Sequence, residues 1–291
     1  MESKINRYSK QLILINSFFI LAWLIVSVFP FIWTFWGSFK VKADFFSRAD
    51  WMFAVTGVNT LIETGDTSTV KAYVESWTEG EFWKATMNTI IITVSVVTIS
   101  LFLGTLGAYA LSRSTYKYTF WILIAALIFR AMPHITLVSG YLFPFFQLNV
   151  WGILPTTIIV LVAINQPFTL WLLYSFFKTV PKELDESALI DGCSYFQAFR
   201  FVIMPVMWPG VVTAGLFSMM LAYNDFTVTS LLLNQQNYTM VPKINAYLGT
   251  IEHSGNYMWA VSSVVSATAP LFMIIMSVSY THLRAHETEA Y

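Results

Sequence analysis

Long apolar runs, separated by shorter polar segments, set the pattern of this sequence. Several runs approach about 20 residues, the length that an α-helix needs to cross roughly 30 Å of hydrocarbon. Small residues in two of them, including Gly104, Gly107 and Gly215, would let neighbouring helices approach closely. The pattern predicts an all-α polytopic membrane protein with six transmembrane helices. We expect these spans at residues 12–35, 88–111, 118–141, 154–176, 207–223 and 258–279.

Composition agrees with a membrane location and excludes several classes of function. Hydrophobic residues make up 56% of the chain and charged residues 11%, whereas a soluble domain has roughly 25% charged residues. The formal net charge is zero, and no basic cluster suits nucleic acid. The single cysteine, Cys193, excludes an internal disulfide and a multi-cysteine metal site. We therefore expect the lipid bilayer as a partner and no nucleic acid.

Basic residues indicate the orientation of the spans. Lys4, Arg7 and Lys10 precede the first span, and basic residues beside a first span favour the cytoplasmic side. With six spans, the predicted cytoplasmic segments hold nine Lys and Arg residues, and the longer external segments hold six. Both termini are therefore expected in the cytoplasm. The external loop at residues 38–85 mixes charged and aromatic residues, which leaves open either a folded segment or a partly ordered linker.

Four polar residues within or beside the spans are candidates for a translocation path: Arg130, Asn165, Gln166 and Asn224. A charged side chain at membrane depth costs about 2.5–3.5 kcal/mol on insertion scales, so Arg130 should face the protein interior, a cavity or a helix end. It either gates the path or pairs with a carbonyl or carboxylate at a broken helix. Asn165 and Gln166 precede Pro167, which removes a backbone hydrogen bond. They either line the path at a kink or hold helices together.

Two further ionisable residues lie close to these candidates in the sequence. His134 is expected to be a packing residue rather than a ligand, and Asp225 is expected near the outer surface rather than buried. No Asp or Glu lies within the predicted spans. Ion-coupled secondary transporters often carry acidic residues at mid-membrane, so this class is disfavoured.

The polar segment at residues 178–209 shows the pattern of two short helices joined at a glycine. Acidic residues in the first turn of the first helix favour the positive end of the helix dipole. Gly192 can adopt the left-handed conformation that closes a helix. Ser194 stands three residues before Gln197, which predicts a capping box at the start of the second helix. Pro205 discourages continuation of this helix and is expected to separate the polar segment from the fifth span.

The order of residue types in this segment resembles the EAA signature of ATP-binding-cassette (ABC) importer permeases. That signature reads E-A-A, three residues, G, nine residues, I, one residue, L-P. The sequence has E-S-A from Glu186, then Gly192 at the expected spacing, and V-x-M-P ending at Pro205. The neighbourhood of residues 197–200 and the phrase FIWTFWGSFKVK from Phe31 resemble the permeases that carry sugars, of the maltose-transporter type.

The resemblance implies a type I ABC importer permease fold, with the loop at 178–209 docking on partner proteins. Such a permease works with two ATPase subunits, a second permease subunit that completes a heterodimer, and an extracellular or periplasmic solute-binding protein. It lies in the inner membrane of a bacterial or archaeal cell. The residues that the resemblance assigns to ATPase coupling are Glu186, Ser187, Ala188, Asp191, Gly192, Arg200 and Pro205.

The sequence contains no G-x-x-x-x-G-K-[ST] loop, no H-E-x-x-H motif and no convincing catalytic triad. We therefore expect a subunit without catalytic residues, metal site or cofactor of its own, whose partner ATPases use ATP and Mg²⁺. A sugar or oligosaccharide is the expected substrate. A polyol, glycerol phosphate, another small solute such as an amino acid or polyamine, or, less favoured, ion-coupled secondary transport stay as alternatives.

The chain is expected to divide into three parts. Residues 1–86 hold the N-terminal segment, the first span and the external loop, and residues 87–280 hold a five-helix permease core. Residues 281–291, THLRAHETEAY, depart from the short basic tail that related sugar permeases carry, which suggests a truncation or an assembly scar.

Overall fold

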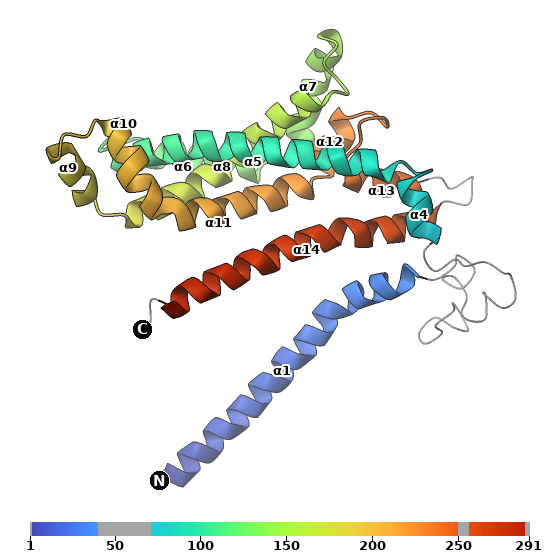
Figure 1. Ribbon diagram of the computed structural model, residues 1–291, viewed down its shortest axis with the longest axis horizontal. Helices are drawn as coiled ribbons and strands as arrows, with labels where there is room; N and C mark the ends of the chain where they lie inside the picture. Colours follow the sequence, from blue (N-terminus) through green and yellow to red (C-terminus); the bar gives the residue numbers. More distant parts are fainter. Residues whose placement is uncertain (1, 40–70, 250–255, 289–291) are drawn as a thin grey trace, which may run out of the picture. The chain divides into compact units, whose positions relative to one another are not determined.

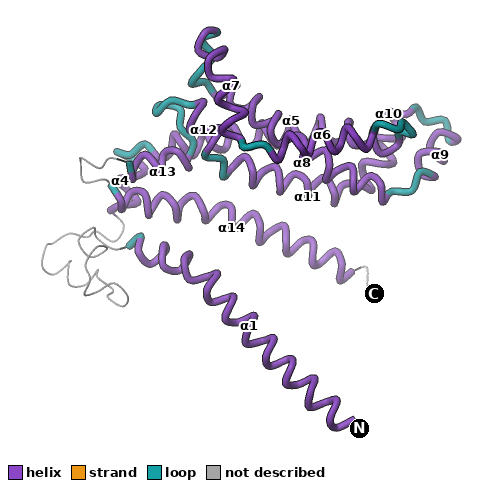
Figure 2. Tube along the Cα trace, turned by 180° about the vertical axis from the view of Figure 1, so that it is seen from behind, coloured by secondary structure: helices purple, strands orange, loops and turns teal. Residues whose placement is uncertain are grey.

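The computed structural model describes residues 2–39, 71–249 and 256–288, and within these ranges every regular element is a helix. Figure 2 shows this part of the chain as helices joined by short loops. The all-α prediction is therefore confirmed. Most of the predicted external loop, at residues 40–70, and the end of the tail, at 289–291, lie outside the described residues. The predicted division of the chain at residues 86 and 280 stays a prediction.

Five described helices are long and apolar enough to cross a membrane. Each contains or overlaps one of the predicted runs. They are α1 (Glu2–Gly37, apolar from Leu12), α5 (Phe82–Arg113), α8 (Leu154–Thr179), α11 (Met204–Tyr223) and α14 (Tyr257–Thr288).

The third predicted span is not one straight helix. Its residues form α6 (Thr119–Ala131) and α7 (His134–Gln147), which are bent by 85° at the break between them. Met132 has an extended backbone, with ψ at 143°, and Pro133 follows it. Proline disfavours the helical conformation in the residue before it and lacks an N–H, so the helix stops there. Counting the bent pair as one span gives the six that the sequence predicts.

The described chain forms two compact units, Met1–Phe82 with Ile244–Tyr291, and Trp83–Lys243. In the first unit, α14 packs against the short helix α4 (Lys71–Trp77) and contacts α1. Trp259 Nε1 donates to Glu75 Oε2 at 3.0 Å, and Ser262 Oγ donates to the Ala72 carbonyl at 3.2 Å. The apolar side chains of α1 are exposed along the helix, as expected for a helix surrounded by lipid.

The second unit, Trp83–Lys243, is built around α8, which packs against α6 and α11. Glycine allows the closest approaches: a Cβ placed on Gly210 would lie 2.9 Å from Phe176 Cγ, and one on Gly104 would lie 3.0 Å from Leu173 Cδ1. This confirms the close packing that the small residues predict. In Figure 1 the helices α9 (Glu183–Ile190) and α10 (Tyr195–Ala198) lie at one end of this unit, and α12 (Thr227–Leu232) lies at the other.

The structure corrects the expectation that Pro205 separates the polar loop from the fifth span. The chain stays helical from Tyr195 to Tyr223, through α10, a π-helical turn η1 (Phe199–Ile203) and α11. The wider turn lets the Met204 N–H reach the Phe199 carbonyl, five residues back. Pro205 then falls in the first turn of α11, where a missing N–H costs little. The second helix of the loop and the fifth span therefore form one continuous helix.

Candidate functional site

The polar segment between α8 and α11 folds as its sequence predicts. Three carboxylates lie in the first turn of α9, and Gly192 follows with φ at +89°. The Ser194 N–H donates to Gln197 Oε1 at 2.8 Å, and the Gln197 N–H donates to Ser194 Oγ at 3.3 Å, which together form the capping box of α10. Both predicted signals, the left-handed glycine and the capping box, are confirmed.

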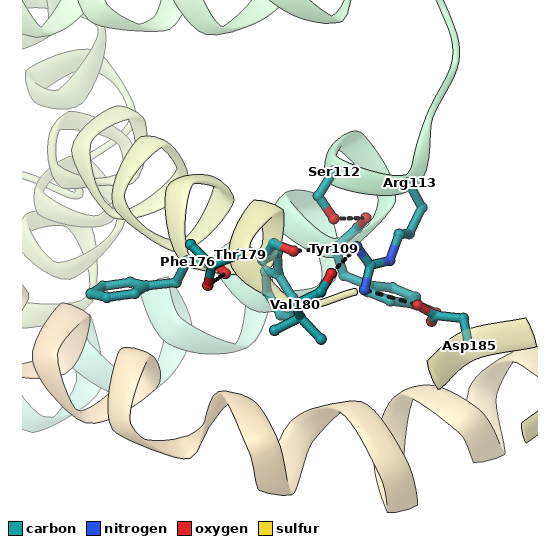
Figure 3. Close-up of polar contacts among 8 residues, drawn as sticks. Tyr109, Ser112, Arg113, Phe176, Thr179, Val180 and Asp185 are labelled. Carbon is teal, nitrogen blue, oxygen red and sulfur yellow. Dashed lines mark hydrogen bonds and ion pairs between the residues drawn. The ribbon is translucent and has the colours of Figure 1, made fainter. Parts of the chain in front are cut away.

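A cluster of three side chains fastens α9 to the helices beside it. Arg113 Nη2 lies 2.8 Å from Asp185 Oδ2, and the Tyr109 hydroxyl donates to Asp185 Oδ1 at 2.5 Å. Arg113 Nη1 also donates to the carbonyls of Phe177 at 3.2 Å and Val180 at 3.1 Å, at the end of α8. Figure 3 shows the guanidinium between the Val180 carbonyl and the Asp185 carboxylate. One arginine thus ties α5, α8 and α9 together.

The burial of this cluster makes its charges interdependent. The side chains of Arg113 and Asp185 are only 16% and 14% exposed. The Tyr109 ring packs against Phe199 of η1 and Phe177 of α8, with centroids 4.9 and 5.7 Å apart. Removing one partner of a buried ion pair leaves the other charge without compensation, which is strongly destabilising. The cluster should therefore hold α9 rigidly against the ends of α5 and α8.

The residues that the sequence assigned to this loop differ in their exposure. Ala188 is 5% exposed, because it packs inside this chain on the face shared with Leu184. Its small size is thus explained by packing within the chain. The remaining six are exposed at the surface: Glu186, Ser187, Asp191, Gly192, Arg200 and Pro205.

Large apolar side chains are also exposed around the turn between α9 and α10. Ile190 is 85% exposed, Tyr195 76% and Phe196 64%. We call these three residues, with Glu186 and Ser187, the outer face of the loop. Exposed apolar groups rimmed by polar residues are typical of a surface that binds a partner protein or a membrane.

A polar cavity lies elsewhere in the same unit, between the α6–α7 break, α8 and the junction of α11 and α12. Its volume is about 290 Å³, and its polar lining includes His134, Asn165, Asn224 and Asp225. Arg130, at the end of α6, contacts Nε2 of His134 across the break. The predicted path residues Arg130, Asn165 and Asn224 are thus brought close together. Arg130 lies at a broken helix, as one of the two alternatives expected, but its contact there is the imidazole of His134 rather than a carbonyl or a carboxylate.

Gln166 lies apart from these residues. It lines a different and mostly apolar cavity of about 540 Å³ between α6, α7 and α8. Its Nε2 donates to the Ser100 carbonyl of α5 at 3.4 Å. The helix α8 itself stays continuous through Pro167. This placement matches the alternative in which an amide side chain holds helices together.

Asp225 is partly buried, in contrast to the expected place at the outer surface. Its Oδ1 accepts from the backbone N–H groups of Val228 and Thr229, both at 2.9 Å, at the start of α12. Burial raises the pKa of the Asp225 carboxyl above its ordinary value, while the hydrogen bonds from Thr229 and Val228 oppose the rise. The carboxylate is therefore held in place at the edge of the cavity. An N-cap pattern ahead of α12 was the available sequence signal for this position.

Sequence reasoning did not find the cluster around Arg113. Arg113 is one of the nine basic residues of the predicted cytoplasmic segments, and Asp185 is one of the acidic residues in the first turn of the first loop helix. Nothing local in the sequence links two residues that are 72 positions apart. Tyr109 carries no signal of its own, because a tyrosine near the end of a span is ordinary.

Comparison with known proteins places these features in a family. The chain is 26% identical over 267 residues to the permease protein NgcG of the diacetylchitobiose uptake system of Streptomyces coelicolor, covering 88% of this chain and 81% of that one. It is 29% identical over 274 residues to the trehalose/maltose transport system permease protein MalG of Thermococcus litoralis, covering 93% and 92%.

A solved structure has the same fold. It belongs to a bacterial ABC transporter involved in the import of the acidic polysaccharide alginate, and it matches with a TM-score of 0.73 over 92% of this chain and 95% of that chain, at 18% identity. The type I ABC importer permease fold is therefore confirmed. A family model matches residues 100–286. This range contains the α6–α7 break, the residues that line the polar cavity, and the polar segment between α8 and α11. The chain belongs to the family of inner membrane components of binding-protein-dependent transport systems.

Proposed function

We propose that this chain is a permease subunit of an ATP-driven importer of sugars or oligosaccharides. The observation that carries the proposal is the outer face of the loop, exposed at the end of a unit and anchored to two spans through Arg113. The printed names of relatives that cover most of the chain, which are permeases for diacetylchitobiose and for trehalose/maltose, support a sugar as substrate.

The loop would dock on one of two ATPase subunits, which bind ATP and Mg²⁺. Closure of the ATPase pair would push on the outer face of the loop, and α9 would pass this movement to α5 and α8 through the Arg113–Asp185 pair. The continuous helix from Tyr195 to Tyr223 would carry the same movement into α11. The permease needs no catalytic residue of its own in this scheme.

Further partners complete the transporter. A second permease subunit, different from this chain, would form the other half of the membrane passage, and a solute-binding protein would deliver the sugar. Both termini would then lie in the cytoplasm, on the side of the ATPases. The residues Arg130, Asn165 and Asn224 are the candidates on this chain for the wall of the passage. Gln166, the fourth residue that the sequence proposed for it, lines a separate cavity and donates to the Ser100 carbonyl of α5. Family membership speaks against the ion-coupled alternative.

Gly192 offers a test of the loop conformation. No atom lies within 4 Å of a Cβ placed on Gly192, but its φ is +89°. Gly192→Val should therefore cost about 1–2 kcal/mol through backbone strain alone, and uptake should fall about tenfold. Gly192→Asn should keep most of the uptake, because asparagine tolerates positive φ. Equal losses in the two variants, measured as initial uptake rates at matched expression, would contradict the role given to the backbone conformation.

The experiment that tests the proposed function is uptake by the assembled transporter. The chain is reconstituted in liposomes with its partner permease, its ATPase subunits and its binding protein. Radiolabelled diacetylchitobiose, maltose and trehalose are then supplied with and without internal ATP. Uptake of at least one sugar that requires both ATP and the binding protein is expected. Absence of uptake for every sugar in the panel, with an ATPase that is active and stimulated by the binding protein, would exclude this sugar class.

A further inference from the structure

We propose that this chain itself contacts the transported sugar, through the polar cavity at the α6–α7 break, and that the cavity takes one neutral sugar ring. This inference rests on the proposed function. The cavity volume of about 290 Å³ lies just below the range of about 300–1,000 Å³ that is usual for ligand-binding clefts. That size suits one ring of an oligosaccharide rather than the whole molecule.

Asn165 supplies the first reason to expect a ligand. Its side chain is 3% exposed, and its Nδ2 has no hydrogen-bond partner among the described residues, although the residue lines the cavity. Buried amide groups are nearly always paired, because an unpaired buried donor is costly. A hydroxyl oxygen of a bound sugar would provide the missing acceptor.

Asp225 supplies a hydrogen-bond acceptor for a hydroxyl group of the sugar. Its Oδ1 is occupied by the N–H groups of Val228 and Thr229, which fixes the plane of the carboxylate and leaves Oδ2 for another partner. Hydrogen bonds from hydroxyl groups to a carboxylate are stronger than those between neutral groups. Asn224 donates its Nδ2 to the Met220 carbonyl at 3.0 Å, so its Oδ1 is a second acceptor at the same junction.

His134 is a further polar residue of the lining. The guanidinium of Arg130 can only donate, so Nε2 of His134 accepts in their contact, and the proton of a neutral imidazole then sits on Nδ1. The rest of the lining is largely apolar and includes Leu161, Met220 and Phe226. A sugar ring presents hydroxyl groups that both donate and accept, together with a face of C–H groups. The polar groups of the lining can pair with the hydroxyl groups, and its apolar side chains can pack against the C–H face.

The charges around the cavity favour a neutral ring over an acidic one. Asp225 is a carboxylate in the lining, and no Lys or Arg is among the residues that line the cavity. The guanidinium of Arg130 lies outside the lining and contacts Nε2 of His134 instead. A sugar acid or a sugar phosphate would place its anion beside the Asp225 carboxylate without a basic side chain in the lining to compensate. The same argument disfavours glycerol phosphate as the solute held here.

The test uses variants that separate ligand contact from folding. Asn165→Leu removes the unpaired amide and keeps a side chain of similar size, which is nearly neutral for stability when the amide has no ligand. Asp225→Ser retains a side-chain oxygen that caps α12 and removes Oδ2. Ser175→Ala, at an exposed position of α8, is the matched control. Each is reconstituted with the partner subunits and the binding protein.

The expected result is a loss of sugar uptake of about tenfold or more in Asn165→Leu and in Asp225→Ser, with Ser175→Ala unchanged. The melting temperature and the ATPase activity stimulated by the binding protein should stay at the wild-type level. Monodeoxy analogues of the transported sugar provide a second readout. The wild type should discriminate against removal of a particular hydroxyl, and the variants should lose that discrimination.

The outcomes that overturn the inference are distinct from failure of the proposed function. Wild-type transport with unchanged uptake in both variants would show that this chain makes no such contact. A loss of uptake accompanied by a lower melting temperature or a lower stimulated ATPase activity would assign the residues a structural role instead. A wild-type transporter that takes up no sugar of the panel would overturn the proposed function and the inference together.

Discussion

Asp185→Ala is expected to abolish most of the transport activity while leaving the chain in the membrane. The substitution removes the carboxylate that binds Arg113 at 2.8 Å and accepts from Tyr109 at 2.5 Å. Arg113 would keep its bonds to two carbonyls of α8 but would lose its counter-charge. Breaking a largely buried pair costs about 3–5 kcal/mol, and the remaining exposure of both side chains places the expected cost near the lower value.

The loss should appear first as uncoupling of the loop from α5 and α8. Uptake by the reconstituted transporter should fall by about tenfold or more, and the melting temperature of the purified chain should fall as well. Glu183→Ala is the matched control, because Glu183 is an exposed carboxylate two residues earlier in the same helix. Wild-type uptake and stability in Asp185→Ala would contradict the anchoring role of the pair. A comparable loss in Glu183→Ala would show that the charge of the first turn matters, rather than the contact with Arg113.

Ile190→Asp should prevent the assembly of the transporter without unfolding the chain. The Ile190 side chain is 85% exposed, so the substitution should change the stability of the free chain by no more than about 0.5 kcal/mol. In a complex with an ATPase, however, the new carboxylate would be buried without a partner at the outer face of the loop. An uncompensated buried charge costs about 3 kcal/mol or more, which corresponds to a loss of affinity of roughly 100-fold.

Co-purification of the ATPase subunits with the tagged chain measures this effect directly. Ile190→Val, which keeps an apolar side chain, is the control and should retain the ATPases. Retention of the ATPases by Ile190→Asp at the wild-type level would place the docking surface elsewhere on the chain. A parallel fall in the melting temperature of the free chain would point to a role in folding instead.

The parts of the fold that the sequence predicted well depend on local chemistry. Apolar runs predict spans because a helix must be apolar over its length to cross the bilayer. Gly192 and the capping box at 194–197 predict helix ends, because glycine tolerates the positive φ there and the Ser194 and Gln197 side chains pair with backbone N–H groups. The break of the third span at Pro133 was only partly visible. A proline in an apolar run signals a kink, but neighbouring helices decide whether the two halves stay aligned.

The parts that the sequence did not predict depend on contacts between distant positions. The pairing of Arg113 with Asp185 is set by how the ends of α5, α8 and α9 meet. The gathering of His134, Asn165 and Asp225 around one cavity likewise follows from packing. The prediction that the helix ends at Pro205 was wrong for a different reason. A single π-helical turn before Pro205 accommodates a proline that would otherwise end the helix.

The measurement that tests the central claim most directly is a crosslink from the outer face of the loop. A single cysteine is placed at the exposed Ser187, with Cys193 replaced by serine, and the chain is assembled with its ATPase subunits. The adjacent Ala188→Cys, at a buried position, is the control. The account predicts a crosslink between position 187 and an ATPase whose yield changes when ATP is added, and little or none from position 188. Absence of a crosslink from position 187 in an assembled transporter would contradict the docking of this loop on the ATPase.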